Sequence, residues 1–121
     1  MNLPIAPSVV SGVNPLHHYN WGKNCEAAVL VDNEEMTIKL EKMPAGAEEE
    51  LHYHKRSQQF FFITKGKAVI EVDGVILFVH QGEGLLIEAG RQHKIMNKEE
   101  QTIEFILYSQ PGVVNDRFSL A

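Results

Sequence analysis

The chain has 121 residues, a formal net charge of −5 and a hydrophobic content of 44%. This length predicts one domain with a single core, and the acidic balance excludes a general nucleic-acid surface. No apolar run approaches a membrane span, and no basic stretch precedes a long apolar run as in a signal peptide. The single cysteine, Cys25, precludes an internal disulfide bond. These features predict a cytoplasmic protein without nucleic-acid or membrane partners.

The first 25 residues contain Pro4, Pro7 and Pro15 and show no sustained hydrophobic period. Such a segment is typical of an extended or irregular arm. We therefore expect an N-terminal arm at residues 1–25, able to exchange between the subunits of a homodimer, followed by one domain at residues 26–121.

Beyond the arm, short apolar or alternating runs are separated by turn residues. The predicted strands cover residues 27–31, 36–41, 49–54, 59–64, 67–72, 75–79, 85–87, 93–97 and 101–109. Asp73-Gly74 between two of them is the strongest hairpin signal, because both central residues of a tight hairpin turn need positive φ. The only helix expected is a single turn within residues 113–121. This pattern predicts an all-β sandwich, barrel or jelly roll.

Three histidines and one glutamine have the spacing of a metal site. His52 and His54 are two residues apart, so on a strand both rings point to the same face. Gln59 and His93 can supply two further donors from elsewhere in the chain. Two imidazoles on one face joined by two other donors are typical of a first-row transition-metal site.

The spacing around these residues resembles the paired motifs of the cupin superfamily, G-x5-H-x-H-x3-4-E-x6-G and G-x5-P-x-G-x2-H-x3-N. Eight of the ten defining positions match; the two departures are Gln59 in place of glutamate and Glu88 in place of proline. The resemblance covers about residues 36 to 110. The matching positions are Gly46, His52, His54, Gly66, Gly82, Gly90, His93 and Asn97.

The resemblance implies a single-domain, all-β double-stranded β-helix (jelly-roll barrel) with one divalent metal held by His52, His54, Gln59 and His93. Imidazole and oxygen donors admit Fe, Mn, Zn, Ni or Cu, and the sequence does not choose among them. Because glutamine is neutral where the family has glutamate, all four ligands leave the charge of the ion uncompensated. We therefore expect the site to favour an anionic exogenous ligand.

Strand alternation suggests which other side chains surround this site. If residues with the parity of the ligands face inward, a small apolar pocket is lined by Met36, Ile38, Phe61, Ile95 and Phe105. By the same parity Glu50 shares the face of His52 and His54, which makes it the candidate catalytic proton-transfer group. Trp21 in the arm is expected to pack, or to cover the cavity.

The resemblance leaves the reaction open, because related cupins include dioxygenases, isomerases and decarboxylases. The leading hypothesis is a small metal-dependent enzyme acting on an organic acid, a sugar derivative or a phenolic. The alternative is a non-catalytic cupin that binds or senses a small molecule or metal. The resemblance also implies a homodimer.

Overall fold

The computed structural model describes residues 7–120 and contains eleven β-strands within that range. No helix occurs there, and hence none that is long and apolar enough to cross a membrane. The strands are β1 (His17–Trp21), β2 (Cys25–Asp32), β3 (Thr37–Met43), β4 (His52–Tyr53), β5 (Gln58–Lys65), β6 (Lys67–Val72), β7 (Val75–His80), β8 (Gly84–Ile87), β9 (His93–Met96), β10 (Ile103–Gln110) and β11 (Phe118–Ser119).

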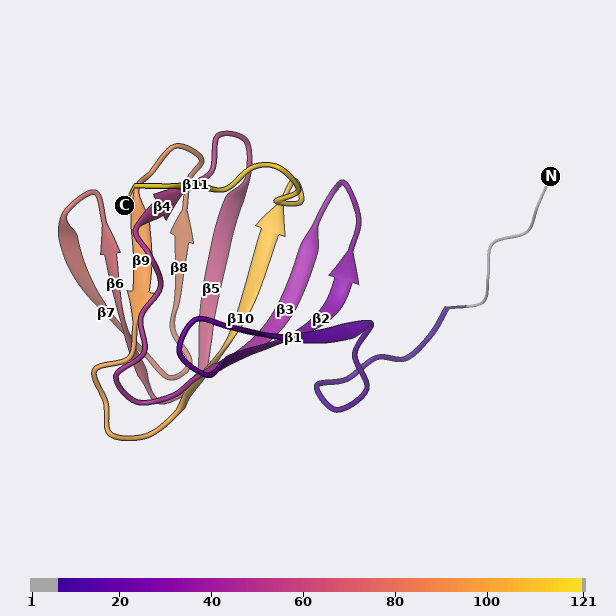
Figure 1. Cartoon of the computed structure of the whole chain (residues 1–121), viewed down its shortest axis with the longest axis horizontal. Helices are drawn as coiled ribbons and strands as arrows, with labels where there is room; N and C mark the ends of the chain where they lie inside the picture. Colours follow the sequence, from indigo (N-terminus) through magenta and orange to yellow (C-terminus); the bar gives the residue numbers. More distant parts are fainter. Residues whose placement is uncertain (1–6, 121) are drawn as a thin grey trace.

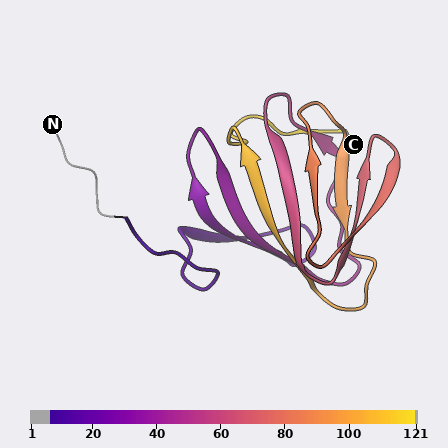
Figure 2. The same cartoon turned by 180° about the vertical axis from the view of Figure 1, so that it is seen from behind.

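The strands form two antiparallel sheets that face each other as a jelly roll (Figure 1). One sheet has the order β1-β2-β3-β10-β5-β8, and the other has the order β11-β4-β9-β6-β7. Figure 2 shows the same arrangement from behind, with the C-terminal segment passing over the end of the barrel that carries β4. The predicted all-β double-stranded fold is therefore confirmed.

Alternating side chains of the central strands fill the space between the sheets. In β5, Gln59, Phe61 and Ile63 are buried, and across an antiparallel ladder they lie opposite Ser109, Leu107 and Phe105 of β10, respectively. Burial of these apolar faces is the main force that joins the two sheets. The β6–β7 hairpin turns through Asp73 and Gly74, whose φ angles of 49° and 84° confirm the predicted turn.

Three local expectations are wrong. In β3, Thr37, Lys39 and Glu41 point inward, whereas Met36 and Ile38 were expected to do so. Residues 17–21, expected in the irregular arm, form β1 and pair with β2 in the same sheet. The tail forms a turn and then strand β11 in place of a helical turn. Residues 1–6 of the expected arm and Ala121 lie outside the described part of the chain.

Candidate metal centre

The three predicted histidine ligands meet at one end of the barrel. His52, His54 and His93 are all buried, and one potential ligand atom from each lies within 4.8 Å of the others. His52 and His93 are direct partners in the register of β4 and β9, which explains how residues far apart in sequence converge. The structure therefore contains a three-histidine cluster that could hold a metal ion.

Two backbone carbonyl groups fix the orientation of the imidazoles. His52 Nδ1 lies 2.7 Å from the Glu50 carbonyl oxygen, and His93 Nδ1 lies 2.8 Å from the Arg91 carbonyl oxygen. Because a carbonyl oxygen only accepts, each Nδ1 carries the proton and donates it. In the neutral ring, each Nε2 then presents a lone pair to the site, which is the tautomer that a metal ligand needs.

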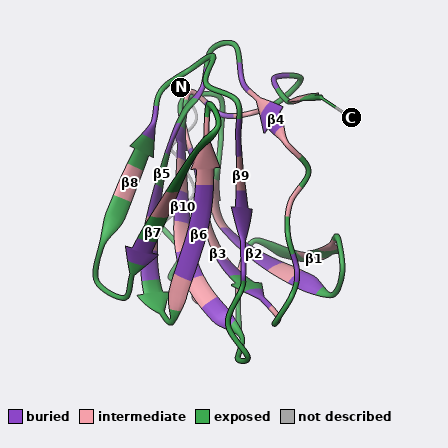
Figure 3. Cartoon of the chain, turned by 90° about the vertical axis from the view of Figure 1, so that its left-hand side faces the viewer, coloured by how far each residue is buried: buried purple, intermediate pink, exposed green. Residues whose placement is uncertain are grey.

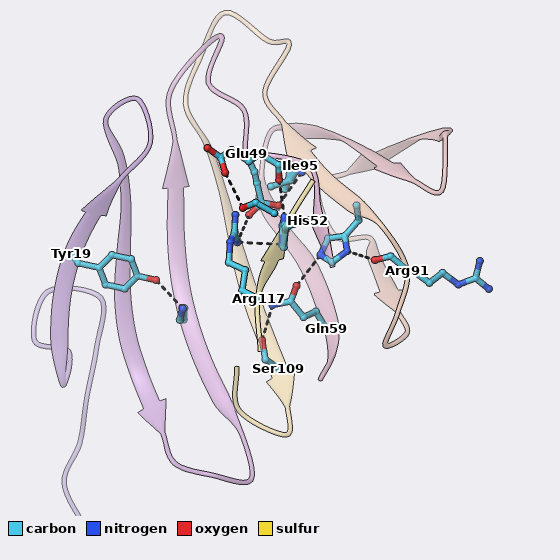
Figure 4. Close-up of polar contacts among 12 residues, drawn as sticks. Tyr19, Glu49, His52, Gln59, Arg91, Ile95, Ser109 and Arg117 are labelled. Carbon is cyan, nitrogen blue, oxygen red and sulfur yellow. Dashed lines mark hydrogen bonds and ion pairs between the residues drawn. The ribbon is translucent and has the colours of Figure 1, made fainter. Parts of the chain in front are cut away.

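Gln59 joins the cluster through its side-chain oxygen (Figure 4). Its Nε2 donates to Ser109 Oγ at 2.9 Å, and its Oε1 lies 3.1 Å from His93 Nε2. Since His93 already carries its proton on Nδ1, neither of these two facing atoms has a hydrogen to share. The two lone pairs repel each other, and a cation bound by both would remove this repulsion. The donor set therefore fits a metal ion.

Burial keeps the three imidazoles unprotonated. It lowers the pKa of His52 to about 3 and that of His54 to about 4, and it also lowers the pKa of His93. Loss of hydration disfavours the charged imidazolium, and the positive charge of Arg117 disfavours it further at all three rings. The cluster is therefore in its metal-binding protonation state throughout the neutral range.

The loops around the cluster are held by specific backbone contacts. The N–H of Gly90, at φ 88°, donates to the His54 carbonyl oxygen and so links the loop before β9 to that histidine. Such a φ strongly favours glycine, which accounts for this motif position. On the other side, the buried carboxylate of Asp116 accepts the N–H groups of residues 55–57, between His54 and Gln59, at 2.8–3.3 Å.

A cavity of about 410 Å³ opens beside His54 and Gln59. Its lining differs from the predicted one. None of Met36, Ile38, Phe61, Ile95 and Phe105 lines it; Phe61, Ile95 and Phe105 belong to the core. The observed lining includes many charged and polar residues and comprises Tyr19, Trp21, Gly22, Lys39, Glu41, Glu48, Glu49, Glu50, His54, Gln59, Leu107, Val113 and Arg117. Trp21 packs against the hydrophobic core, as expected, and it also contributes to the cavity lining.

Two carboxyl groups in this lining are shielded from solvent. Burial raises the pKa of Glu41 to about 7, against the opposing effect of Lys39 and the Trp21 indole. Burial also raises the pKa of Glu49 to about 7, against Arg117. Lys39 Nζ in turn donates to the Tyr19 hydroxyl at 2.8 Å. The cavity therefore holds two acids that can gain or lose a proton near neutral pH.

Glu50, the predicted catalytic residue, lies at the edge of the cavity with an exposed side chain. Its carboxylate accepts a hydrogen bond from Ser119 at 3.0 Å, while its backbone carbonyl orients His52. Sequence alternation missed Glu49 because the chain is not a regular strand before His52. It also missed Arg117, whose Nη1 donates to His52 Nε2 at 3.2 Å.

Comparisons with known proteins agree with this architecture. An "RmlC-like cupin" from Shewanella frigidimarina superposes with a TM-score of 0.77 at 20% identity, covering 90% of this chain and 96% of that one. A "predicted oxalate decarboxylase" from Thermotoga maritima gives a TM-score of 0.75 at 20% identity, covering 86% and 99%. At such identities these likenesses show the fold.

Sequence comparison gives a narrower match. "Polyketide synthase CurC" from Streptomyces cyaneus is 23% identical over 60 residues, which are 50% of this chain and 39% of that protein. The chain thus matches about two fifths of the length of this curated relative. The family model for the Cupin domain matches residues 39–108, a range that includes all four predicted ligands. The chain therefore belongs to the cupin family.

Proposed function

We propose that this protein is a metal-dependent enzyme that binds one divalent transition metal through His52, His54, Gln59 and His93 and acts on a small organic acid. The observation that carries the proposal is the convergence of four neutral donors, with Gln59 Oε1 and His93 Nε2 facing each other at 3.1 Å. When bound, an ion would supply Lewis-acid activation of a substrate oxygen.

A carboxylate suits this site for two reasons. The four protein ligands are neutral, so an anion would compensate the charge of the ion. Lys39 and Arg117 also line the cavity and can pair with an anion, while two of the four glutamates in the same lining, Glu41 and Glu49, have pKa values raised to about 7 and so carry less negative charge than exposed carboxylates. The description of the Thermotoga maritima neighbour as a predicted oxalate decarboxylase is consistent with an acid of this kind.

Within this function, Glu41 is better placed than Glu50 to hold or accept a substrate proton. Glu41 is only 6% exposed, lines the cavity and has a pKa of about 7. A carboxyl group with such a pKa changes its protonation at the pH of most enzymatic reactions. The exposed Glu50 carboxylate is instead held by Ser119.

The test has a binding arm and a catalytic arm. After removal of metals with a chelator, we expect the protein to take up one equivalent of Zn²⁺, Mn²⁺, Fe²⁺, Ni²⁺ or Cu²⁺. His93→Ala should lose most of this affinity. His80→Ala is the matched control, because its ring is exposed and pairs only with Glu83 within the described chain. The metal-loaded protein is then assayed against small carboxylic acids with and without O2.

The outcomes separate the alternatives. Metal binding with turnover of an acid supports the enzyme. Metal binding without turnover of any acid favours the non-catalytic binding or sensing cupin. Failure to bind any of the five metals, or equal binding by His93→Ala, would refute the metal site itself.

We also propose that the protein forms a homodimer through the apolar outer faces of β5, β7 and β8. Phe60 and Leu86 are cross-strand partners on β5 and β8, and both are exposed. Val75, Ile76 and Phe78 of β7 are exposed as well. Figure 3 shows the exposed stretches along β7 and β8 on this side of the molecule. Light scattering at micromolar concentration tests the proposal; a monomer would contradict it.

A further inference from the structure

Arg117 makes its only described polar contacts inside the candidate metal centre (Figure 4). Its Nη1 donates to His52 Nε2 at 3.2 Å and lies 3.5 Å from Glu49 Oε2. Within residues 7–120, no hydrogen bond or ion pair involves its Nε or Nη2. The guanidinium therefore has donors left over at the wall of the cavity that it lines.

The position of Arg117 is built into the fold. Asp116, one residue before it, is 1% exposed and accepts the backbone N–H groups of residues 55–57. Strand β11, directly after it, pairs with β4, with Ser119 opposite His52. Both neighbours of Arg117 are thus tied to the segment that carries two of the proposed ligands, so the Arg117 backbone is held beside them.

The His52 contact is incompatible with metal binding. Because His52 Nδ1 carries the proton, Nε2 has one lone pair directed to the site. That lone pair can accept the Arg117 N–H or bind a metal ion, but not both. Loading the site must therefore release Nη1 from His52, while the ion pair with Glu49 can keep the guanidinium at the cavity wall.

We propose that Arg117 is the carboxylate-recognition residue of this cavity, and that it is freed for this role when a metal takes the His52 Nε2 lone pair. A released guanidinium presents a planar fork of N–H donors that matches the two oxygens of a carboxylate. The proposal rests on the proposed function, since it requires the metal site. It predicts that empty and loaded protein differ in their affinity for carboxylates.

The experiment compares wild-type protein with Arg117→Gln and with Arg56→Gln. Arg56 is the matched control because it is exposed, bears the same charge and contacts the Val114 carbonyl oxygen outside the cavity lining. Zn²⁺ affinity is measured by competition with a coloured chelator. We expect Arg117→Gln to bind Zn²⁺ about tenfold more tightly, because a charged hydrogen bond to the ligating atom is removed.

The second measurement is malonate binding to each Zn²⁺-loaded protein by calorimetry. Arg117→Gln should bind malonate at least about tenfold more weakly than wild type, with Arg56→Gln unchanged. Equal Zn²⁺ affinities or equal malonate affinities of wild type and Arg117→Gln would overturn this proposal while leaving the metal site intact. If neither wild type nor Arg117→Gln binds Zn²⁺ or the other four metals, both this proposal and the proposed function fail.

Discussion

Replacement of Asp116 by alanine tests how the C-terminal segment holds the loop between His54 and Gln59. The carboxylate accepts hydrogen bonds from the N–H groups of Lys55, Arg56 and Ser57, and Ser57 is itself 1% exposed. Alanine leaves the Ser57 N–H without a partner, which costs about 1–3 kcal/mol. The other two N–H groups belong to exposed residues and can turn to water, so each loses about 0.5–1 kcal/mol.

The expected loss in the free energy of unfolding is therefore about 3 kcal/mol. For a chain of this size, 1 kcal/mol corresponds to about 4 °C, so the melting temperature should fall by about 12 °C. Asp116→Asn keeps one accepting oxygen and should lose about half as much. Asp32→Asn is the control, because Asp32 is exposed and makes no side-chain hydrogen bond within residues 7–120.

Thermal unfolding of the metal-free protein at pH 7 measures these values, and hydrogen exchange locates them. In Asp116→Ala, the amides of residues 55–57 should exchange faster, while those of the β6–β7 hairpin should not. A loss below about 1 kcal/mol, or unchanged exchange at residues 55–57, would refute the reasoning that Asp116 anchors this loop.

Three further outcomes follow from buried side chains and close packing. Burial raises the pKa of Glu41 from 4.5 to about 7, so the folded protein holds a proton that the unfolded chain has lost, and stability falls as the pH rises through this interval. In urea unfolding, Glu41→Gln should therefore be about 3 kcal/mol more stable than wild type at pH 8 and almost equal to it at pH 4. Parallel pH profiles of the two proteins would contradict this. Gly84→Ala should lower the free energy of unfolding by about 1–3 kcal/mol, because a Cβ there would collide with Phe60 Cζ and lie 3.0 Å from the Phe61 carbonyl oxygen. An unchanged urea midpoint would contradict this and show that β8 can shift. Cys25 is fully buried, and burial raises its pKa to about 11, so it should resist iodoacetamide in native protein and react in urea; rapid native labelling would mean that β2 opens.

Much of the fold could be predicted from local patterns in the sequence. Nine of the eleven strands correspond to predicted segments, because turn residues such as Asp73-Gly74 and alternating apolar residues act over short distances. The two missed strands, β1 and β11, lie at sheet edges and carry few apolar residues. Their pairing depends on the rest of the barrel, which local periodicity does not contain.

The three-histidine cluster could also be predicted, since the spacing of its members is a property of the sequence. The residues that line the cavity could not be predicted in this way. The inward face of β3 carries Lys39 and Glu41, so a rule that places apolar residues inside selected the wrong face. A polar inner face is stable here because it borders a cavity. Arg117 lies 24 residues beyond His93, and its role depends on the tertiary contact between β11 and β4.

The pairing of Ser119 with His52 has a practical bearing on how the protein should be handled. A purification tag fused after the last strand could disturb the pairing of β11 with β4 and so the position of Arg117. A polyhistidine tag at that end would also bring competing imidazoles to the mouth of the barrel. A tag without histidines, placed on the amino-terminal side ahead of the exposed stretch before β1, would disturb neither the pairing of β11 with β4 nor the metal measurements.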